Sequence, residues 1–259
     1  MLNPERVLAI PGPTEPWHAG TLAGFDLETT GRNPHTARIV TASIVLLDSQ
    51  GQLRATAEWL VDPGVEIPAA AAAVHGVTTE HARQHGMDAT QGLSQIVATL
   101  MDFMYHRIPI VAYNGVYDFT VLTAEMQRRN MGDFSVAGVI DPYVLDKHVD
   151  TYRKGKRTLE AVSAHYGVTL DAAHTSLADS IAAVQVAQAM VARHPERFDV
   201  PLETIFNHQI RWKAEQAASF EQYLRRKNPQ ATVSRDWPVE QPPAPLDTPR
   251  LGDTPDLLL

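Results

Sequence analysis

TLAGFDLETTGRNPHTARIVTASIVLL, residues 21–47, is the stretch that decides the fold of this chain. Two apolar runs rich in β-branched residues, 21–27 and 37–47, flank the turn signal GRNP. A third run, GQLRATAEWLV (51–61), follows directly after the turn signal DSQGQ. Consecutive strands joined by such short connections pair with alternating direction. The sequence therefore predicts a three-stranded antiparallel meander.

Downstream of the meander, helical and strand patterns alternate. Apolar periodicity and helix-forming composition predict helices over 68–75, 89–106, 117–129, 157–167 and 176–194, and compact apolar strands over 108–114 and 136–142. Thr78 or Thr79 can cap a further short helix. A meander that feeds βα units gives an α/β fold, a mixed five-stranded sheet flanked by helices. This is the element order of ribonuclease H-like folds.

Chemically informative side chains lie in three separated segments of this pattern: Asp26, Glu28, Asp118, His174 and Asp179. Asp26 and Glu28 are two residues apart in a strand, so both carboxylates point to one face. Asp118 and Asp179 each fall in the first turn of a helix, and His174 lies just before the second of these helices. Gathering four carboxylates is unfavourable because like charges repel and each loses hydration, and a cation reverses that balance. The set predicts a metal-dependent enzyme if the fold brings the segments together.

Each of these side chains also has an ordinary structural explanation. Two acids at a solvated strand end are common, Asp118 suits a helix N-terminus, and Asp179 suits a capping partner. A single histidine at a helix start is more often structural than functional. The metal-site interpretation therefore depends on the five residues occurring together.

Composition limits the kind of metal and the kind of partner. The chain has 259 residues and no cysteine, so any metal would be bound by Asp, Glu, His or water, which favours hard ions such as Mg²⁺ or Mn²⁺. A formal net charge of -8 disfavours a protein that coats duplex nucleic acid, but is compatible with an enzyme that grips a strand end through metal ions. No apolar run reaches the roughly 20 residues of a membrane helix, and the N-terminus lacks a signal-peptide pattern. We expect a cytoplasmic protein with no membrane contact.

The motifs resemble those of the DEDDh 3′–5′ exonucleases, a family that includes the proofreading epsilon subunit of bacterial DNA polymerase III and ribonuclease T. FDLETTGRNP with RIVTASIVLL resembles the first motif, VAYNGVYDFTVL the second and AHTSLADSIAAVQV the third, in family order over roughly residues 21–193. VEIPAAAAAVHGVTTEHA matches the family's intermediate segment. Tyr113 stands where many members have His. The resemblance implies catalytic roles for Asp26, Glu28, Asp118, His174 and Asp179, with the four carboxylates as metal ligands.

Phosphodiester hydrolysis in such a site is suited to two divalent cations, Mg²⁺ or Mn²⁺. Our hypothesis is that Asp26 contacts both ions, that Glu28 and Asp179 complete the site of the ion that holds the nucleophilic water, and that Asp118 serves the other ion. His174 would accept the proton of the water, because an imidazole with an ordinary pKa is suited to that transfer near neutral pH.

Further residues are candidates for substrate binding. Thr29 and Thr30 precede Gly31, where the lack of a side chain permits close approach to the terminal sugar. A plain turn explains these three residues equally well. Val74 and His75 match family positions that line the pocket for the terminal nucleotide.

Two further features of the sequence each allow either a structural role or a role in substrate binding. Asn114 precedes Asp118 at the family spacing, and we favour a supporting role for it in the strand-to-helix turn over substrate contact. The basic run YRKGKR (152–157) either contacts the phosphates of the incoming strand or forms a solvated loop.

The chain divides into four expected parts: a loose leader over 1–20, a DEDDh-type exonuclease domain over 21–200, a helical extension over 201–228, and a Pro-rich flexible tail over 229–259. The tail ends in DLLL, a candidate docking segment for a polymerase or a sliding clamp.

The leading functional hypothesis is a 3′–5′ exonuclease that releases nucleoside 5′-monophosphates from single-stranded DNA or RNA, with DNA favoured. An exoribonuclease or an oligonucleotide-degrading nuclease uses the same chemistry, because selectivity for the sugar depends on contacts to the 2′-hydroxyl. A catalytically silent protein that binds nucleic acid or a polymerase is the third alternative, and the intact acid set argues against it.

Overall fold

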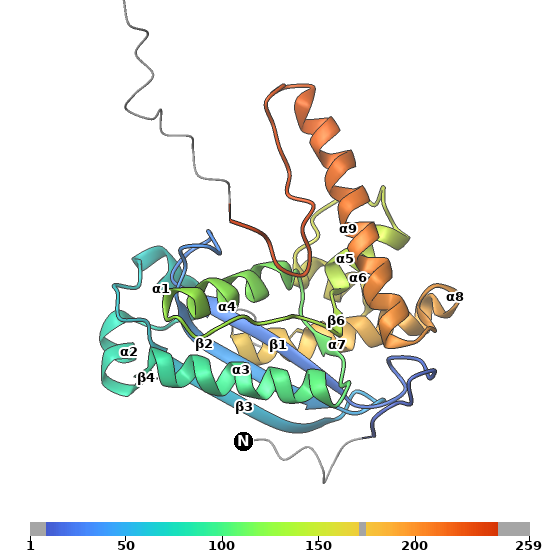
Figure 1. The fold of residues 1–259 in the computed structure, drawn as a ribbon. Helices are drawn as coiled ribbons and strands as arrows, with labels where there is room; N and C mark the ends of the chain where they lie inside the picture. Colours follow the sequence, from blue (N-terminus) through green and yellow to red (C-terminus); the bar gives the residue numbers. More distant parts are fainter. Residues whose placement is uncertain (1–8, 171–174, 243–259) are drawn as a thin grey trace, which may run out of the picture.

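The computed structural model describes residues 9–170 and 175–242, and it is built around one mixed sheet (Figure 1). The strand order is β4-β3-β2-β1-β5-β6. The predicted meander is confirmed: β1 (Leu22–Thr29) pairs antiparallel with β2 (Ile39–Leu47), which pairs antiparallel with β3 (Leu53–Asp62).

Three short strands complete the sheet. β5 (Ile110–Val111) pairs parallel with β1, and β6 (Val139–Ile140) pairs parallel with β5. A sixth strand, β4 (Met87–Asp88), pairs parallel with the end of β3, whereas the sequence predicted five strands. Two residues between two helices are too few to show an alternating pattern, which explains why β4 was missed.

The helices follow the predicted order with two additions. They are α1 (Ala69–His75), α2 (Thr79–His85), α3 (Ala89–Tyr105), α4 (Val116–Arg128), α5 (Pro142–Val149), α6 (Leu159–Tyr166), α7 (Ser176–Arg193), α8 (Pro195–Phe198) and α9 (Leu202–Arg225). The short helices α5 and α8 were not predicted. Among the described residues, no helix combines the length and the apolar character that a membrane crossing requires.

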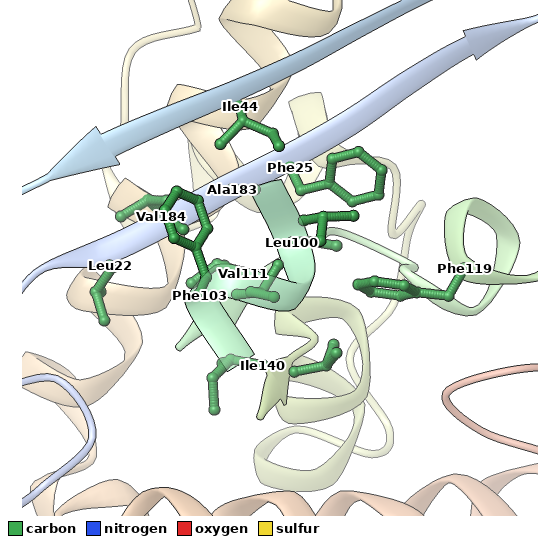
Figure 2. Close-up of a cluster of buried hydrophobic side chains, with 14 of the residues drawn as sticks. Leu22, Phe25, Ile44, Leu100, Phe103, Val111, Phe119, Ile140, Ala183 and Val184 are labelled. Carbon is green, nitrogen blue, oxygen red and sulfur yellow. The ribbon is translucent and has the colours of Figure 1, made fainter. Parts of the chain in front are cut away.

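The core lies on both faces of the sheet (Figure 2). Phe25 of β1 packs against Phe119 of α4, with ring centroids 5.5 Å apart. Gly24 faces the other way, toward α7, where an added Cβ would lie only 2.4 Å from the carbonyl oxygen of Ser180. A glycine at this position therefore allows α7 to lie directly on β1, and this contact brings the first turn of α7 to the strand face that carries Asp26 and Glu28.

The described parts of the N-terminal and C-terminal segments, residues 9–20 and 229–242, pack more closely than their composition suggested. Trp17 is fully buried, and its indole Nε1 donates to the carbonyl of Phe198 at 3.0 Å, so the described part of the leader is not loose. At the other end, the chain from 229 to 242 returns along α9 and buries Trp237 (Figure 1). The composition of each segment is polar and Pro-rich, but each contains one tryptophan, Trp17 or Trp237, that packs into the core. Residues 243–259, with the DLLL end, lie outside the described residues.

Candidate active site

Three carboxylates from β1 and α7 converge at the end of the central strand. Asp26, Glu28 and Asp179 each offer one oxygen, and these oxygens all lie within 4.8 Å of one another. Asp26 and Glu28 are brought together by strand alternation, as the sequence predicted. Asp179 lies in the first turn of α7, where the side chain of Thr175 accepts from the backbone N–H of Ala178 at 3.3 Å.

A fourth carboxylate, Asp118, adjoins this group from the first turn of α4. Its side chain is buried, and Oδ1 accepts from the backbone N–H of Leu27 at 3.1 Å. Because Leu27 lies between Asp26 and Glu28, this bond fixes α4 against the end of β1. His174 lies outside the described residues, so its position relative to the carboxylates stays a prediction.

The electrostatics of the cluster favour a bound cation. Burial raises the pKa of Asp26 well above its usual value, and the charges of Asp118, Asp179 and Glu28 raise it further. Burial and the charge of Asp179 raise the pKa of Glu28 to about 7. Carboxylate oxygens are the ligands that hard divalent ions prefer, and such an ion would relieve the repulsion. The donor set therefore fits a divalent metal.

A first prediction concerns the stability of the metal-free protein. The folded-state pKa of Glu28, about 7, exceeds its ordinary value of 4.5, so the unfolded chain ionises first and gains stability relative to the folded one as the pH rises. In chelator, we therefore expect the melting temperature to decrease as the pH is raised from 4.5 to about 7. Added Mg²⁺ or Mn²⁺ should raise it more at about pH 8 than at about pH 5. Thermal unfolding at both pH values checks this, and equal metal-induced shifts would contradict it.

One cavity, of about 710 Å³, opens on one side of the carboxylates, between the end of β1 and α1. Its lining includes Glu28 and four residues predicted to bind substrate, Thr29, Thr30, Val74 and His75. Its volume is within the range of small-molecule sites. The structure thus places these four predicted residues around one space that begins at the carboxylate cluster.

His75 and Tyr117 add two more polar side chains to the lining of this cavity. His75 Nδ1 accepts from the backbone N–H of Val77 at 3.2 Å, and its buried Nε2 has no hydrogen-bond partner among the described residues. Burial lowers the pKa of His75, which favours the neutral imidazole. The Tyr117 hydroxyl donates to the carbonyl of Gly31 and also contacts the hydroxyl of Thr29. Sequence reasoning missed Tyr117, because an aromatic residue beside Asp118 gives no signal of its own.

A second cavity, of about 450 Å³, lies on the side of Asp179 and is also lined by Asn114, Tyr143 and Arg157. Asn114 adopts a positive φ of 56°, and its backbone N–H donates to Asp141 Oδ1 at 2.8 Å. The backbone of Asn114 is thus part of the strand-to-helix turn, and the role of its side chain stays a prediction.

Asp141, which the sequence did not single out, connects that turn to the C-terminal part of the chain. It is buried, and burial raises its pKa to about 6. The indole Nε1 of Trp237 donates to Asp141 Oδ2 at 3.3 Å, and the backbone N–H of Asp141 donates to Gln209 Oε1 of α9 at 2.6 Å. The C-terminal segment also touches α4, because the backbone N–H of Glu240 donates to Thr120 Oγ1 at 2.8 Å. These contacts brace the loop and helix that carry Asn114 and Asp118.

Replacing Trp237 by alanine tests this brace. We expect a loss of about 3–5 kcal/mol in the free energy of unfolding, the usual cost of removing a buried tryptophan. Trp237→Phe keeps most of the apolar volume and removes only the indole donor to Asp141, so it should cost about 1–2 kcal/mol. Chemical denaturation of both variants measures these values. An unchanged stability in Trp237→Ala would show that the return segment does not pack in solution.

In the basic run 152–157, only some of the side chains are available to contact a nucleic-acid strand. Arg153 Nη2 lies 2.5 Å from Asp146 Oδ2, and Arg157 binds the same buried carboxylate. Lys154 and Lys156 are exposed. The arginines therefore hold the loop in place, and Arg157 also lines the second cavity beside Asp179.

The sheet, the flanking helices and the acidic cluster define the class of protein, one of the ribonuclease H-like fold with a carboxylate cluster that could hold a metal ion. A model of the exonuclease family (RNase_T) matches residues 23–187, and the chain belongs to this family.

Several known proteins are similar to this chain. DNA polymerase III PolC-type of Clostridium perfringens is 23% identical over 176 residues, which are 68% of this chain and 12% of the relative. A DNA polymerase III subunit epsilon-like protein of Rhodobacter capsulatus is 27% identical over 196 residues, 73% of this chain and 27% of the relative. The crystal structure of Escherichia coli exonuclease I with a dT13 oligonucleotide shares the fold, with a TM-score of 0.58 and 22% identity over 69% of this chain and 42% of that one. The chain thus spans less than half the length of these three proteins.

Proposed function

We propose that this chain is a metal-dependent 3′–5′ exonuclease that hydrolyses phosphodiester bonds at the 3′ ends of single-stranded nucleic acid, DNA in preference to RNA. The observation that carries this proposal is the convergence of Asp26, Glu28 and Asp179, whose oxygens lie within 4.8 Å of one another beside a cavity of about 710 Å³. The preference for DNA is supported by similar proteins named as DNA polymerase III components and by an exonuclease I structure that contains dT13.

The four carboxylates would hold two divalent cations, Mg²⁺ or Mn²⁺. Asp26 would contact both, Glu28 and Asp179 one, and Asp118 the other. Such a pair supplies an activated water and charge stabilisation for the leaving 3′ oxygen. The protein contributes the fixed array of oxygens, and its cost in repulsion is evident in the raised pKa values of Asp26 and Glu28.

Side chains around the cluster would bind the terminal nucleotide and accept the proton of the attacking water. The terminal nucleotide would occupy the cavity lined by Thr29, Thr30, Val74 and His75. His174 would accept the proton of the attacking water as the new phosphorus–oxygen bond forms and the bond to the 3′ oxygen breaks. The products are a nucleoside 5′-monophosphate and a strand one nucleotide shorter with a free 3′-hydroxyl.

Degradation of matched strands tests this proposal. Single-stranded DNA and RNA of one sequence, labelled at the 5′ end, should shorten stepwise from the 3′ end in Mg²⁺ or Mn²⁺ and stay intact in chelator. Faster loss of RNA would favour the exoribonuclease alternative, and binding without cleavage would favour the silent one. Internal fragments as the first products would contradict an exonuclease.

Proofreading beside a polymerase is a second proposal, and it rests on the names of the similar proteins. The contact of the DLLL end with a polymerase or a sliding clamp stays a prediction. A chain that stops at residue 242 keeps Trp237 and Glu240, so it separates that contact from the fold. Unchanged binding of polymerase and clamp by this shorter chain would contradict it.

A further inference from the structure

A long arm projects from the C-terminal side of the protein (Figure 1). We call residues 218–236, the outer part of α9 and the chain that returns from it, the C-terminal arm. The inner part of α9 is anchored on α5: Trp212 stacks on His148 with centroids 3.8 Å apart, and Gln216 Nε2 donates to the carbonyl of Val144 at 3.0 Å. From Gln216 the helix continues to Arg225, a further ~13 Å at 1.5 Å per residue.

The arm and its base are basic in an acidic protein. Between residues 210 and 236 there are six basic side chains against three acidic ones, a net charge of +3 where the whole chain carries -8. The basic residues are Arg211, Lys213, Arg225, Arg226, Lys227 and Arg235, and the acidic ones are Glu215, Glu221 and Asp236. Glu221 contacts Arg225 at 3.0 Å and Arg235 at 3.7 Å. Arg226 and Lys227 are exposed and form no ion pair within the described part of the chain.

Two aromatic rings lie exposed on the same arm. Phe220 and Tyr223 are 50% and 55% exposed, and their rings are stacked with centroids 6.3 Å apart at 13°. Gln209, Gln216 and Tyr223 are seven residues apart, so they share one stripe of the helix. The first two bind the body of the protein, and the third continues that stripe into solvent. The face that packs at the base thus continues outward as an aromatic surface, and the exposed Arg226 and Lys227 follow it at the end of the helix.

Basic side chains lie between the aromatic surface of the arm and the candidate active site. Arg157 and Tyr143 line the cavity beside Asp179. Lys147 Nζ lies 4.9 Å from the centroid of the Tyr143 ring, and Lys147 is close enough to Lys213 for their charges to repel. Lys213 lies at the base of the arm, two turns of helix before Phe220. A nucleic-acid strand that leaves the cleavage site along this side would pass Lys147 and then Lys213.

We propose that the C-terminal arm binds the single-stranded substrate upstream of the 3′ end that is being cleaved. Phe220 and Tyr223 stack on bases, while Lys213, Arg226 and Lys227 contact phosphates. Stacking on aromatic side chains combined with a basic track is the usual way to hold a single strand without reading its sequence. The inference rests on the proposed exonuclease function. It also goes beyond the family match, which ends at residue 187.

Binding of a long and a short strand tests the arm. In an Asp26→Asn background, which prevents cleavage, fluorescence anisotropy would compare oligothymidylates of about 25 and about four nucleotides, because only the long strand spans the site and the arm. Phe220→Ala with Tyr223→Ala should weaken binding of the long strand by about tenfold or more and leave the short one unchanged. Arg226→Gln with Lys227→Gln should reduce the slope of log affinity against log salt by about 1.4, or 0.7 for each lost phosphate contact.

A matched control removes exposed apolar groups elsewhere. Met101 and Tyr105 on α3 are 53% and 83% exposed, and Met101→Ala with Tyr105→Ala should leave both strands bound as in the parent. In the active protein, the arm variants should cleave the 4-nitrophenyl ester of thymidine 5′-monophosphate at the normal rate, because this substrate does not reach the arm.

The outcomes separate this inference from the function on which it rests. An inactive wild-type chain would contradict the proposed function. An active wild type whose arm variants bind the long strand normally would overturn the inference alone. Equal weakening for both strand lengths would also overturn it, since the effect would then lie in the cleavage site. Normal strand binding together with conversion of a wild-type dimer to monomer would assign the aromatic face to a second copy of the chain.

Discussion

Asp26→Asn is expected to lower kcat by at least about 10³-fold and, at the same time, to raise the melting temperature of the metal-free protein. Asp26 lies at the centre of the cluster, where burial and the charges of Asp118, Asp179 and Glu28 all raise its pKa. Asparagine keeps the size of the side chain and removes its charge. The variant thus loses a proposed contact to both cations and also loses the repulsion that destabilises the empty site. Degradation assays in Mg²⁺ and thermal unfolding in chelator measure the two effects.

The opposite signs of these effects make the test specific. A variant that is inactive because it is misfolded would show a lower melting temperature, which would contradict the proposed role. Metal should also raise the melting temperature of the variant less than that of the wild type, because one ligand is missing. Asp133→Asn, which removes an exposed acid from a loop, is a matched control that should change neither activity nor stability. Full activity in Asp26→Asn would exclude the metal assignment.

The sequence predicted the features that depend on local pattern. Alternation along β1 placed Asp26 and Glu28 on one face, and the order of strands and helices along the chain was predicted. The convergence of α4 and α7 at one end of the sheet, where Asp118 and Asp179 lie, was only a condition of the prediction and is seen in the structure. Gly24 allows this convergence, because α7 can lie directly on β1 only at a position without a side chain.

Features that depend on contacts between distant parts of the chain escaped prediction. Trp237 reaches Asp141 across 96 residues, and Trp17 reaches Phe198 across 181, so no local pattern could show that these side chains anchor segments that read as polar. The basic run 152–157 was visible, but its division into paired arginines and exposed lysines depends on Asp146, which arrives from α5. Tyr117 was missed for a similar reason, since its hydroxyl binds a turn at the end of β1.

His174→Ala is expected to lower kcat by about 10²–10⁴-fold while the affinity for metal stays unchanged. The residue immediately precedes Thr175, the N-cap of the helix that carries Asp179, and the proposal gives it the proton of the attacking water. Titration of the melting temperature with Mn²⁺ should give the same midpoint for variant and wild type, because an imidazole that moves a proton need not contact the ions. Added imidazole should restore part of the lost rate, since a soluble base can occupy the space that the side chain leaves.

The control for this variant is another histidine. His85→Ala removes an exposed imidazole from the last turn of α2 and should leave kcat unchanged. If His174→Ala keeps the full rate, the proton acceptor must be another group. A weakened Mn²⁺ midpoint would instead make His174 part of the metal site. The rate, the midpoint and the rescue by imidazole together decide whether His174 receives the proton in the proposed reaction.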